Sequence, residues 1–208
     1  VTVGDGWWRG DTGYGGVRNS FGTDLAILCQ LEIDRKTVLI SDKSWSASQE
    51  GPLGLNDLMQ GECYDARKEN ICEWHPVTEK QFGYENLVCS NSFDVVEKEN
   101  YTGKQIHTPN GEVVIDFGQN IAGYVKFGFY AQAGQCITLY HGECLDQNGN
   151  FTQENFQAPE HRVEQCVKYI CKEGWNEYKP EKSIFGFRYI KAITDVKVTE
   201  KNFTAIAV

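Results

Sequence analysis

The chain has 208 residues, of which 40% are hydrophobic and 24% charged, and its formal net charge is −9. This balance is typical of a soluble globular protein, and the negative charge argues against a nucleic-acid partner because the phosphates would be repelled. No apolar run approaches the roughly 18 residues that cross a bilayer, so no membrane partner is expected.

Short runs of alternating β-branched and aromatic residues, separated by Gly, Asn, Asp and Pro, predict strands along the chain. The predicted strands cover residues 2–8, 25–33, 37–45, 62–67, 113–117, 124–130, 136–142, 166–171, 185–192 and 195–199. Turns are expected at several Gly-containing breaks, among them Gly15–Gly16. This spacing predicts an all-β fold of two β-sandwich, jelly-roll-like units.

The boundary between the two units is expected between Glu69 and Thr108, where the sequence is polar and lacks periodicity. We assign residues 1–84 to the C-terminal part of a jelly-roll domain with its connector, and residues 85–208 to a second sandwich. The first unit has about four predicted strands, whereas a jelly roll has about eight. We therefore expect it to be incomplete at its N-terminus, as in a piece of a longer polypeptide that begins at Val1 rather than Met.

An incomplete sandwich leaves an apolar face and strand edges exposed. Missing strands of a longer chain or a second copy of this chain would cover them, so a homodimer through the exposed strand edges is an alternative. The segment 94–104 is expected to run along the second sandwich as an edge strand or arm.

The eight cysteines favour free thiols over disulfides or zinc. None has Cys-x-x-Cys spacing, and the four histidines are scattered, so a zinc site is not expected. Several lie in predicted strands that bury small side chains, which is typical of a protein in a reducing cytoplasm. They are Cys29, Cys63, Cys72, Cys89, Cys136, Cys144, Cys166 and Cys171.

Two segments of the first unit carry candidate carbohydrate-binding residues. In residues 3–16, Asp5, Trp7 and Trp8 lie close together, and indole rings stack on sugars while carboxylates bind hydroxyls or calcium. In residues 44–67, the candidates are Asn56, Asp57 and Glu62. The structural alternatives are a core tryptophan, with one indole inward and the other outward, a turn capped by Asp5, and an ion pair between Asp65 and Arg67.

The second unit carries polar residues at strand ends, among them Asp116, His141, Glu143 and Asp146. Two carboxylates can serve as the acid and base of a glycosidase, but carboxylates at strand ends are common, and we assign no catalytic residue here. Arg188 is expected to pair with a buried acid. Nucleophile-elbow, phosphate-loop, dinucleotide and His-Glu-x-x-His motifs are lacking.

These motifs together resemble the N-terminal accessory region of bacterial α-L-rhamnosidases of the inverting (α/α)6-barrel type. The first element is Gly4-Asp-Gly-Trp-Trp-Arg-Gly10, and the second runs from Gly51-Pro52 through Asn56-Asp57 to Glu62-Cys-Tyr-Asp-Ala-Arg67. The third set is Asp116-Phe-Gly-Gln-Asn-Ile-Ala-Gly123, His141-Gly-Glu143 and Phe185-Gly-Phe-Arg-Tyr-Ile190. Order and spacing agree over nearly the whole chain, although Trp8 replaces a tyrosine and Gln60 an aspartate of the family pattern.

The resemblance implies a parent enzyme that hydrolyses terminal α-L-rhamnosides in a helical barrel C-terminal to this region. It implies that residues 1–84 belong to a carbohydrate-binding-like domain and residues 85–208 to a concanavalin-like domain. By position, Asp5 and Asp57 become calcium candidates in a site for an L-rhamnose-containing saccharide. Such a fragment has scaffold and sugar-contact roles and works with the parent catalytic domain. The alternatives are a small stand-alone glycosidase and a protein–protein assembly module.

Overall fold

The computed structural model describes residues 1–12, 17–71, 73–158 and 162–208, and strands dominate it. The only α-helix in these ranges is the four-residue α1 (Gly6–Arg9), so the all-β prediction is confirmed. The strands are β1 (Gln30–Ile33), β2 (Lys36–Ile40), β3 (Ser46–Ala47), β4 (Leu53–Asp57), β5 (Gly61–Asp65), β6 (His75–Pro76), β7 (Glu99–Thr102), β8 (Lys104–His107), β9 (Val113–Ala131), β10 (Cys136–Gly142), β11 (Cys166–Ile170), β12 (Gly174–Tyr178), β13 (Phe185–Thr194) and β14 (Phe203–Ala207).

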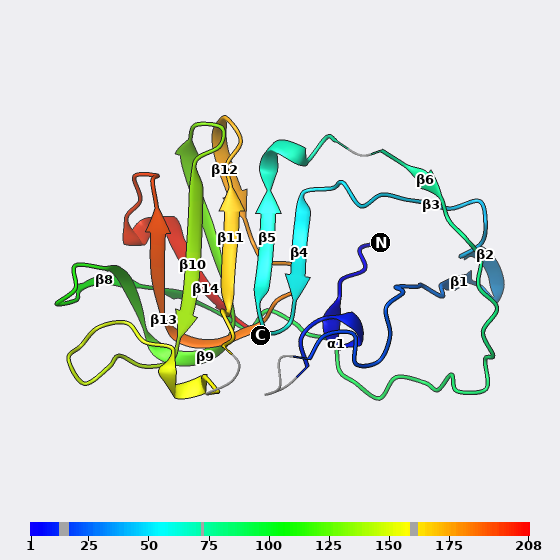
Figure 1. Ribbon diagram of the computed structural model, residues 1–208, viewed down its shortest axis with the longest axis horizontal. Helices are drawn as coiled ribbons and strands as arrows, with labels where there is room; N and C mark the ends of the chain where they lie inside the picture. The colour runs from blue at the N-terminus through cyan, green and yellow to red at the C-terminus, as the bar shows by residue number, and fades with distance from the viewer. Residues whose placement is uncertain (13–16, 72, 159–161) are drawn as a thin grey trace.

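Ten of these strands form one folded sheet in the order β4-β5-β11-β10-β13-β9-β14-β7, with β8 and β12 also paired to β9. Strand β9 belongs to both layers of the resulting sandwich. Its first part, Val113–Asp116, pairs with β8 and β13, residues 121–123 pair with β13 again, and residues 123–131 pair with β14 and β12. Figure 1 shows the strands from β13 to β4 side by side, with the C-terminus on this body and the N-terminus beyond β4.

Strand β9 has an irregular corner near Gly118, between its two stretches of pairing with β13. There the burial alternation of β9 breaks into an exposed stretch, and its register with β13 shifts between Phe187 and Tyr189. Gly118 has φ of +82°, which a glycine adopts without strain. The carboxylate of Asp116 accepts a hydrogen bond of 2.7 Å from the Gly118 backbone N–H and fixes this corner.

Aromatic and β-branched side chains fill the space between the layers. Phe127 lies at the centre, with its ring 5.3 Å from Tyr169, 5.9 Å from Tyr178 and 6.5 Å from Phe203, measured between centroids. Edge-to-face and tilted contacts of this kind add to the apolar burial that stabilises the fold.

The hairpin of β4 and β5 extends the sheet of the second unit. Strand β5 pairs in parallel with β11, from Gly61 opposite Cys166 to Asp65 opposite Ile170. Gly61 is required at this contact because it has φ of +102°, and a Cβ atom there would lie 1.9 Å from the Cys166 carbonyl oxygen. Tyr64 completes the contact, since its ring packs 4.5 Å from that of Tyr178.

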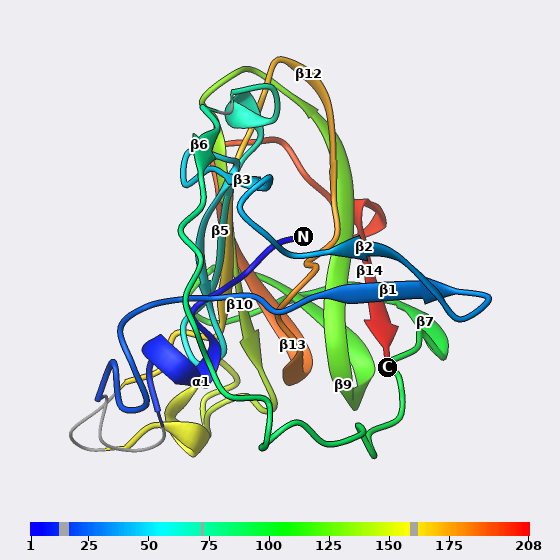
Figure 2. The same cartoon turned by 90° about the vertical axis from the view of Figure 1, so that its right-hand side faces the viewer.

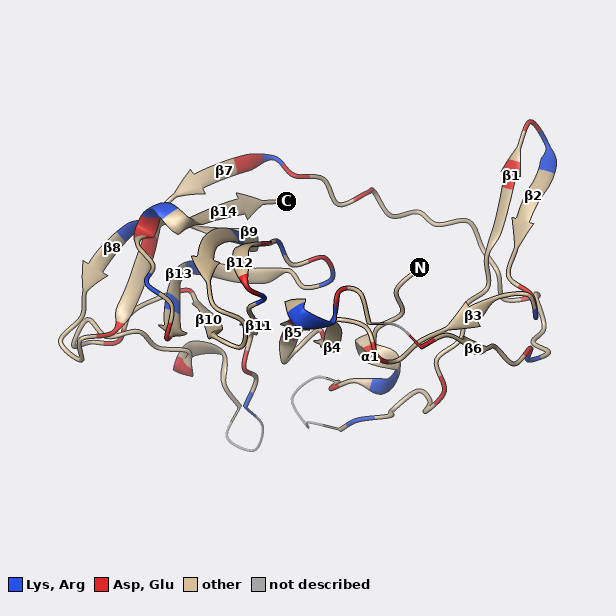
Figure 3. Cartoon of the chain, turned by 90° about the horizontal axis from the view of Figure 1, so that it is seen from above, with Lys and Arg blue, Asp and Glu red and all other residues tan. Residues whose placement is uncertain are grey.

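The rest of the first unit is open. Strands β1 and β2 form a hairpin whose residues are all exposed, including Leu31, Ile33 and Val38, and β3 pairs only with β6. Figures 2 and 3 show the β1–β2 hairpin projecting away from the sandwich. Among the described residues of 1–84, no closed sandwich is present. The incompleteness of the first unit and the boundary at residue 84 stay predictions.

Several strand predictions were wrong in detail. Residues 2–8 contain α1 instead of a strand, because Asp5 and Arg9 form an i,i+4 ion pair that suits one helical turn. Residues 195–199 contain a bend and no strand, and the last strand is β14. The predicted strands 113–117 and 124–130 are one strand, β9. Six strands were not predicted: β3, β4, β6, β8, β12 and β14.

Other expectations concern the arm 94–104 and the cysteines. Segment 94–104 includes the edge strand β7, which pairs with β14. All seven described cysteines are free thiols, and no described helix is long and apolar enough to cross a bilayer. Cys72 and the turn at Gly15–Gly16 lie outside the described residues.

Candidate functional site

The predicted residues Asp5 and Asp57 meet at the end of the β4–β5 hairpin. Asp57 ends β4 and is buried, and its Oδ1 accepts backbone hydrogen bonds of 2.9 and 3.1 Å from Met59 and Gln60. Its Oδ2 accepts a 2.9 Å bond from the Asp11 backbone N–H. Asp5 is held against the same strand, because its N–H donates to the Asn56 carbonyl oxygen over 3.3 Å.

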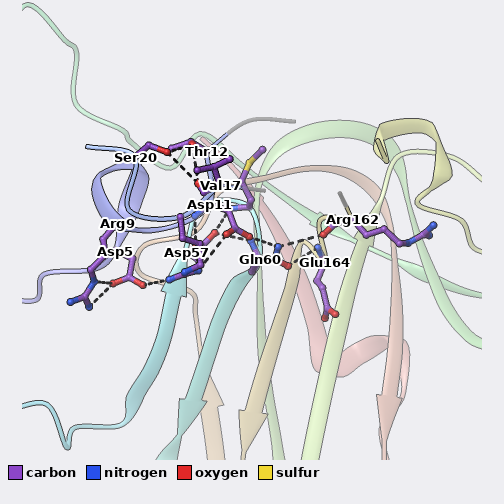
Figure 4. Close-up of polar contacts among 12 residues, drawn as sticks. Asp5, Arg9, Asp11, Thr12, Val17, Ser20, Asp57, Gln60, Arg162 and Glu164 are labelled. Carbon is purple, nitrogen blue, oxygen red and sulfur yellow. Dashed lines mark hydrogen bonds and ion pairs between the residues drawn. The ribbon is translucent and has the colours of Figure 1, made fainter. Parts of the chain in front are cut away.

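Two guanidinium groups compensate these carboxylates. Arg18 lies between the three aspartates, 2.7 Å from Asp5, 3.2 Å from Asp57 and 3.5 Å from Asp11. Burial acts to lower the pKa of Arg18, but the charges of Asp11, Asp57 and Asp5 raise it on balance. Arg9 pairs with the other oxygen of Asp5 over 2.7 Å. We call Asp5, Arg9, Asp11, Arg18 and Asp57 the aspartate–arginine cluster; Figure 4 shows the three aspartates turned toward one another.

Gln60 connects this cluster to the second unit. Its side-chain amide donates to Asp11 Oδ2 over 2.7 Å and to the Arg162 carbonyl oxygen over 3.4 Å. Its Oε1 accepts a 3.2 Å bond from the Glu164 backbone N–H. These contacts are drawn in Figure 4. The residue that departs from the family pattern therefore bridges the two units.

The cluster as folded presents its oxygens to arginine and not to a metal ion. No group of three or more His, Cys, Asp or Glu side chains suited to a metal is found among the described residues. A calcium ion bound to both Asp5 and Asp57 would require Arg18 to move away. Calcium at these two residues stays a prediction.

Trp7 and Trp8 lie on α1, beside the cluster, and both are exposed, with 58% and 50% of their surface accessible. The expectation that one indole points inward was wrong, because adjacent residues of a helical turn do not alternate as in a strand. Trp8 is fixed by a 2.9 Å bond from its indole N–H to the Asp24 carbonyl oxygen. Two indole rings are thus available to a ligand next to a set of charged groups.

Glu62 lies below the surface, with 1% of its area exposed. Its carboxylate accepts hydrogen bonds from Asn56 Nδ2 at 3.2 Å, the Tyr178 hydroxyl at 3.0 Å and the Lys182 backbone N–H at 2.8 Å. Burial raises the pKa of Glu62 in spite of these bonds. In this arrangement Glu62 orients Asn56, which lies at the surface between Glu62 and Asp5.

The polar residues of the second unit serve its folding. Arg188 forms a bidentate pair with the partly buried Asp116, with both distances 2.8 Å, so the expected acidic partner is present. In the first unit, Arg67 pairs with Asp65. His141 is fully buried, stacks 4.1 Å from Phe185, and has its pKa lowered by burial to about 4. It is therefore a neutral core residue.

Arg18, Asp11 and Gln60 were not among the predicted site residues. Arg18 is 39 positions from Asp57 along the chain, and no spacing rule relates them. The one signal that could have pointed to Arg18 was charge, because a buried carboxylate such as that of Asp57 requires a cation nearby.

The comparisons with known proteins cover the whole chain. Residues 1–106 match the α-L-rhamnosidase N-terminal domain, and residues 106–208 match the bacterial α-L-rhamnosidase concanavalin-like domain. Similar curated proteins are α-L-rhamnosidases of Formosa agariphila (28% identical, 92% of this chain and 22% of the relative) and Streptomyces avermitilis (29%, 91% and 19%). The chain thus spans about a fifth of the length of these relatives.

Solved structures agree in fold. An α-L-rhamnosidase from Aspergillus terreus matches with a TM-score of 0.82 and 28% identity, over 99% of this chain and 25% of that one. The Streptomyces avermitilis α-L-rhamnosidase complexed with L-rhamnose matches with a TM-score of 0.83 and 26% identity, over 98% and 21%. Because both family models match, the chain belongs to the α-L-rhamnosidase family, with its N-terminal domain in residues 1–106 and its concanavalin-like domain in residues 106–208.

Proposed function

We propose that this chain is the non-catalytic accessory region of a longer α-L-rhamnosidase, which hydrolyses terminal α-L-rhamnosides with inversion. The observation that carries the proposal is the match of both domains to enzymes of which they form only 19–25%. The parent catalytic domain is then the direct partner of these residues, and this chain provides scaffold and sugar contact.

The acidic groups of the second unit support a non-catalytic role. Glu143 accepts a 2.7 Å bond from Asn155, and Asp146 is used by backbone N–H groups of its own loop. Asp116 is paired with Arg188. An inverting glycosidase needs an acid and a base about 6.5–9.5 Å apart across a sugar-sized space, and these groups are engaged in holding loops and strands.

An activity assay on the isolated chain tests this part. We expect no hydrolysis of an aryl α-L-rhamnoside above the rate of buffer alone. Turnover that disappears in Glu143→Gln or Glu62→Gln would contradict the proposal and favour a small stand-alone glycosidase.

We further propose that the surface around α1 contacts an L-rhamnose-containing saccharide. The exposed rings of Trp7 and Trp8 suit the C–H face of a sugar. Asn56 and the Asp5 carboxylate, which is paired with Arg9 and Arg18, lie half-buried beside them. The buried Asp57 and Glu62 do not contact the sugar in this proposal: Asp57 holds Arg18 by an ion pair, and Glu62 holds the Asn56 side chain by a hydrogen bond. L-rhamnose in the similar Streptomyces avermitilis structure supports the choice of sugar.

Titration calorimetry with L-rhamnose tests the sugar contact. We expect weak binding that Trp7→Ala and Trp8→Ala each reduce at least fivefold, while Trp74→Ala, which removes an equally exposed indole elsewhere, leaves it unchanged. The titration is run with calcium and with a chelator. A binding heat that appears only with calcium supports the predicted roles of Asp5 and Asp57. Equal binding heats with calcium and with chelator assign the contact to the indoles alone. No binding heat under either condition contradicts the sugar contact.

An assembly module is the second candidate, because the β1–β2 hairpin exposes apolar side chains that include Leu31, Ile33 and Val38. A homodimer through exposed strand edges follows from this reading. Sedimentation of the isolated chain distinguishes the two cases, since a monomer at tens of micromolar contradicts self-assembly.

A further inference from the structure

A second pair of exposed aromatic rings lies on the outer layer of the sandwich, away from α1. Tyr130 on β9 is 76% exposed and Trp175 on β12 is 49% exposed. The two residues are directly opposite in the β9–β12 register, and their ring centroids are 5.1 Å apart at an angle of 64°. The neighbouring β9 aromatics Phe127 and Phe129 are buried, so by strand alternation Tyr130 lies on the opposite, outer face of the sheet.

The indole of Trp175 is held in place by the sheet below it. A Cβ atom on Gly128 would lie 2.9 Å from Trp175 Cζ2, which means that the ring lies across this glycine. An ion pair of 3.1 Å between Lys126 and Glu177 borders it on the same face. A surface whose side chains are already ordered loses little conformational entropy on binding.

A shallow surface depression of about 490 Å³ adjoins Tyr130. The residues that line it are Tyr130, Ala131, Gln132, Gln135, Asp195, Val196 and Lys197. Gln135 is fixed by bonds to the Gln132 N–H and the Asp195 carbonyl oxygen. The side chains of Gln132 and Lys197 have no hydrogen-bond or ion-pair partner among the described residues, and Asp195 uses only Oδ1, toward the Cys136 N–H.

We propose that this surface is a second saccharide-binding site, with Trp175 and Tyr130 as the stacking platform and Gln132, Asp195 and Lys197 as the hydrogen-bonding rim. The C–H face of a sugar ring packs on aromatic faces, and its hydroxyls take amide, carboxylate and ammonium partners. The rim carries one negative and one positive charge, which suits a neutral polyhydroxylated ligand. A protein-binding hot spot would instead be surrounded by a larger apolar contact area.

Affinity electrophoresis of the full 208-residue chain tests the site. The probe is a soluble polysaccharide with terminal α-L-rhamnosyl groups. The choice of this sugar rests on the proposed function, whereas the location of the site does not. We expect the chain to be retarded, and Trp175→Ala or Tyr130→Ala to weaken the retardation at least fivefold in dissociation constant. Trp74→Ala is the matched control and should migrate like the unmodified chain.

Rim variants keep the test independent of folding. Gln132→Ala combined with Lys197→Ala removes two side chains without protein partners and should also weaken retardation at least threefold, with unchanged circular dichroism. Retardation that survives both the platform and the rim variants would overturn the inference, as would absence of retardation of the unmodified chain.

A Trp7→Ala, Trp8→Ala double variant distinguishes this site from the surface around α1. Retardation that remains in the double variant and disappears when Trp175→Ala is added supports the second site. If the double variant alone abolishes retardation, the sugar contact at α1 stands and the second site is refuted.

Discussion

The hydroxyl group of Tyr178 donates a 3.0 Å hydrogen bond to Glu62 from 116 positions further along the chain. The Lys182 backbone N–H binds the other oxygen of the same carboxylate, and the ring of Tyr64 packs against that of Tyr178. Strand β5 of the N-terminal domain is thereby fixed to the concanavalin-like domain by pairing, packing and a buried acid. The two domains are expected to unfold together in this region.

Removal of the Tyr178 hydroxyl should destabilise this contact. In Tyr178→Phe, Glu62 Oε2 loses its donor in a buried environment, and an unsatisfied buried acceptor costs about 1–3 kcal/mol. Denaturant unfolding measures the change in free energy. Tyr84→Phe is the control, because Tyr84 is exposed, and an equal loss in both variants would contradict a specific role for the Glu62–Tyr178 bond.

Glu62 should make the protein more stable on mild acidification. Its pKa is raised by burial above the reference value of 4.5, so the native state takes up a proton at a higher pH than the unfolded chain. As the pH falls from neutral through the raised pKa, the contribution of Glu62 to the free energy of unfolding increases, and it levels off near pH 4.5. Glu62→Gln should lack this increase, and a pH profile identical to that of the unmodified chain would refute it.

His141 should make the protein less stable as the pH falls, which is opposite to the effect of Glu62. Its pKa is lowered by burial from 6.5 to about 4, so the unfolded chain is protonated first as the pH falls. The stability that depends on neutral His141 is complete above pH 6.5 and is lost progressively down to about pH 4, by about 3 kcal/mol at most. His141→Phe should remove this slope in unfolding experiments between pH 7 and pH 4, whereas His107→Gln, at an exposed position, should retain it.

Gly61→Ala should destabilise the chain more than Gly174→Ala. Both glycines have positive φ, +102° and +91°, and both substitutions therefore strain the backbone by about 1–3 kcal/mol. At Gly61 the new methyl group also collides with the Cys166 carbonyl oxygen, while nothing lies within 4 Å at Gly174. Equal losses in thermal or denaturant unfolding would show that β5 does not approach β11 as described.

The thiols should differ in reactivity toward an aromatic disulfide reagent. Cys89 is exposed and should react in the native chain, whereas Cys166 and Cys171 are buried. Burial raises the pKa of the Cys166 thiol to about 12 and that of Cys171 to about 11, which leaves almost no thiolate at neutral pH. Eight thiols should titrate in denaturant without reductant, and a lower number would favour disulfides.

The all-β class was predictable because alternation of apolar and polar residues is a local property. The burial pattern of β10 from Cys136 to Gly142 follows that alternation, and the pairing of Arg188 with an acid follows from the cost of an unpaired charge near the core. The missed strand β4 has a weak local signal, because it contains Gly54 and two polar residues, Asn56 and Asp57, and it is stabilised by its partner β5.

For the candidate site, the sequence by itself determined which chemical groups are present: Asp5, Trp7, Trp8, Asn56, Asp57 and Glu62. Only the tertiary structure decided what these groups face, because Arg18 reaches Asp57 across 39 positions and Tyr178 reaches Glu62 across 116. The Glu62–Tyr178 contact goes with the parallel pairing of β5 and β11, 105 residues apart at Gly61 and Cys166 (166 minus 61). Such pairing comes from the shape and packing of the whole sheet, which no local pattern encodes.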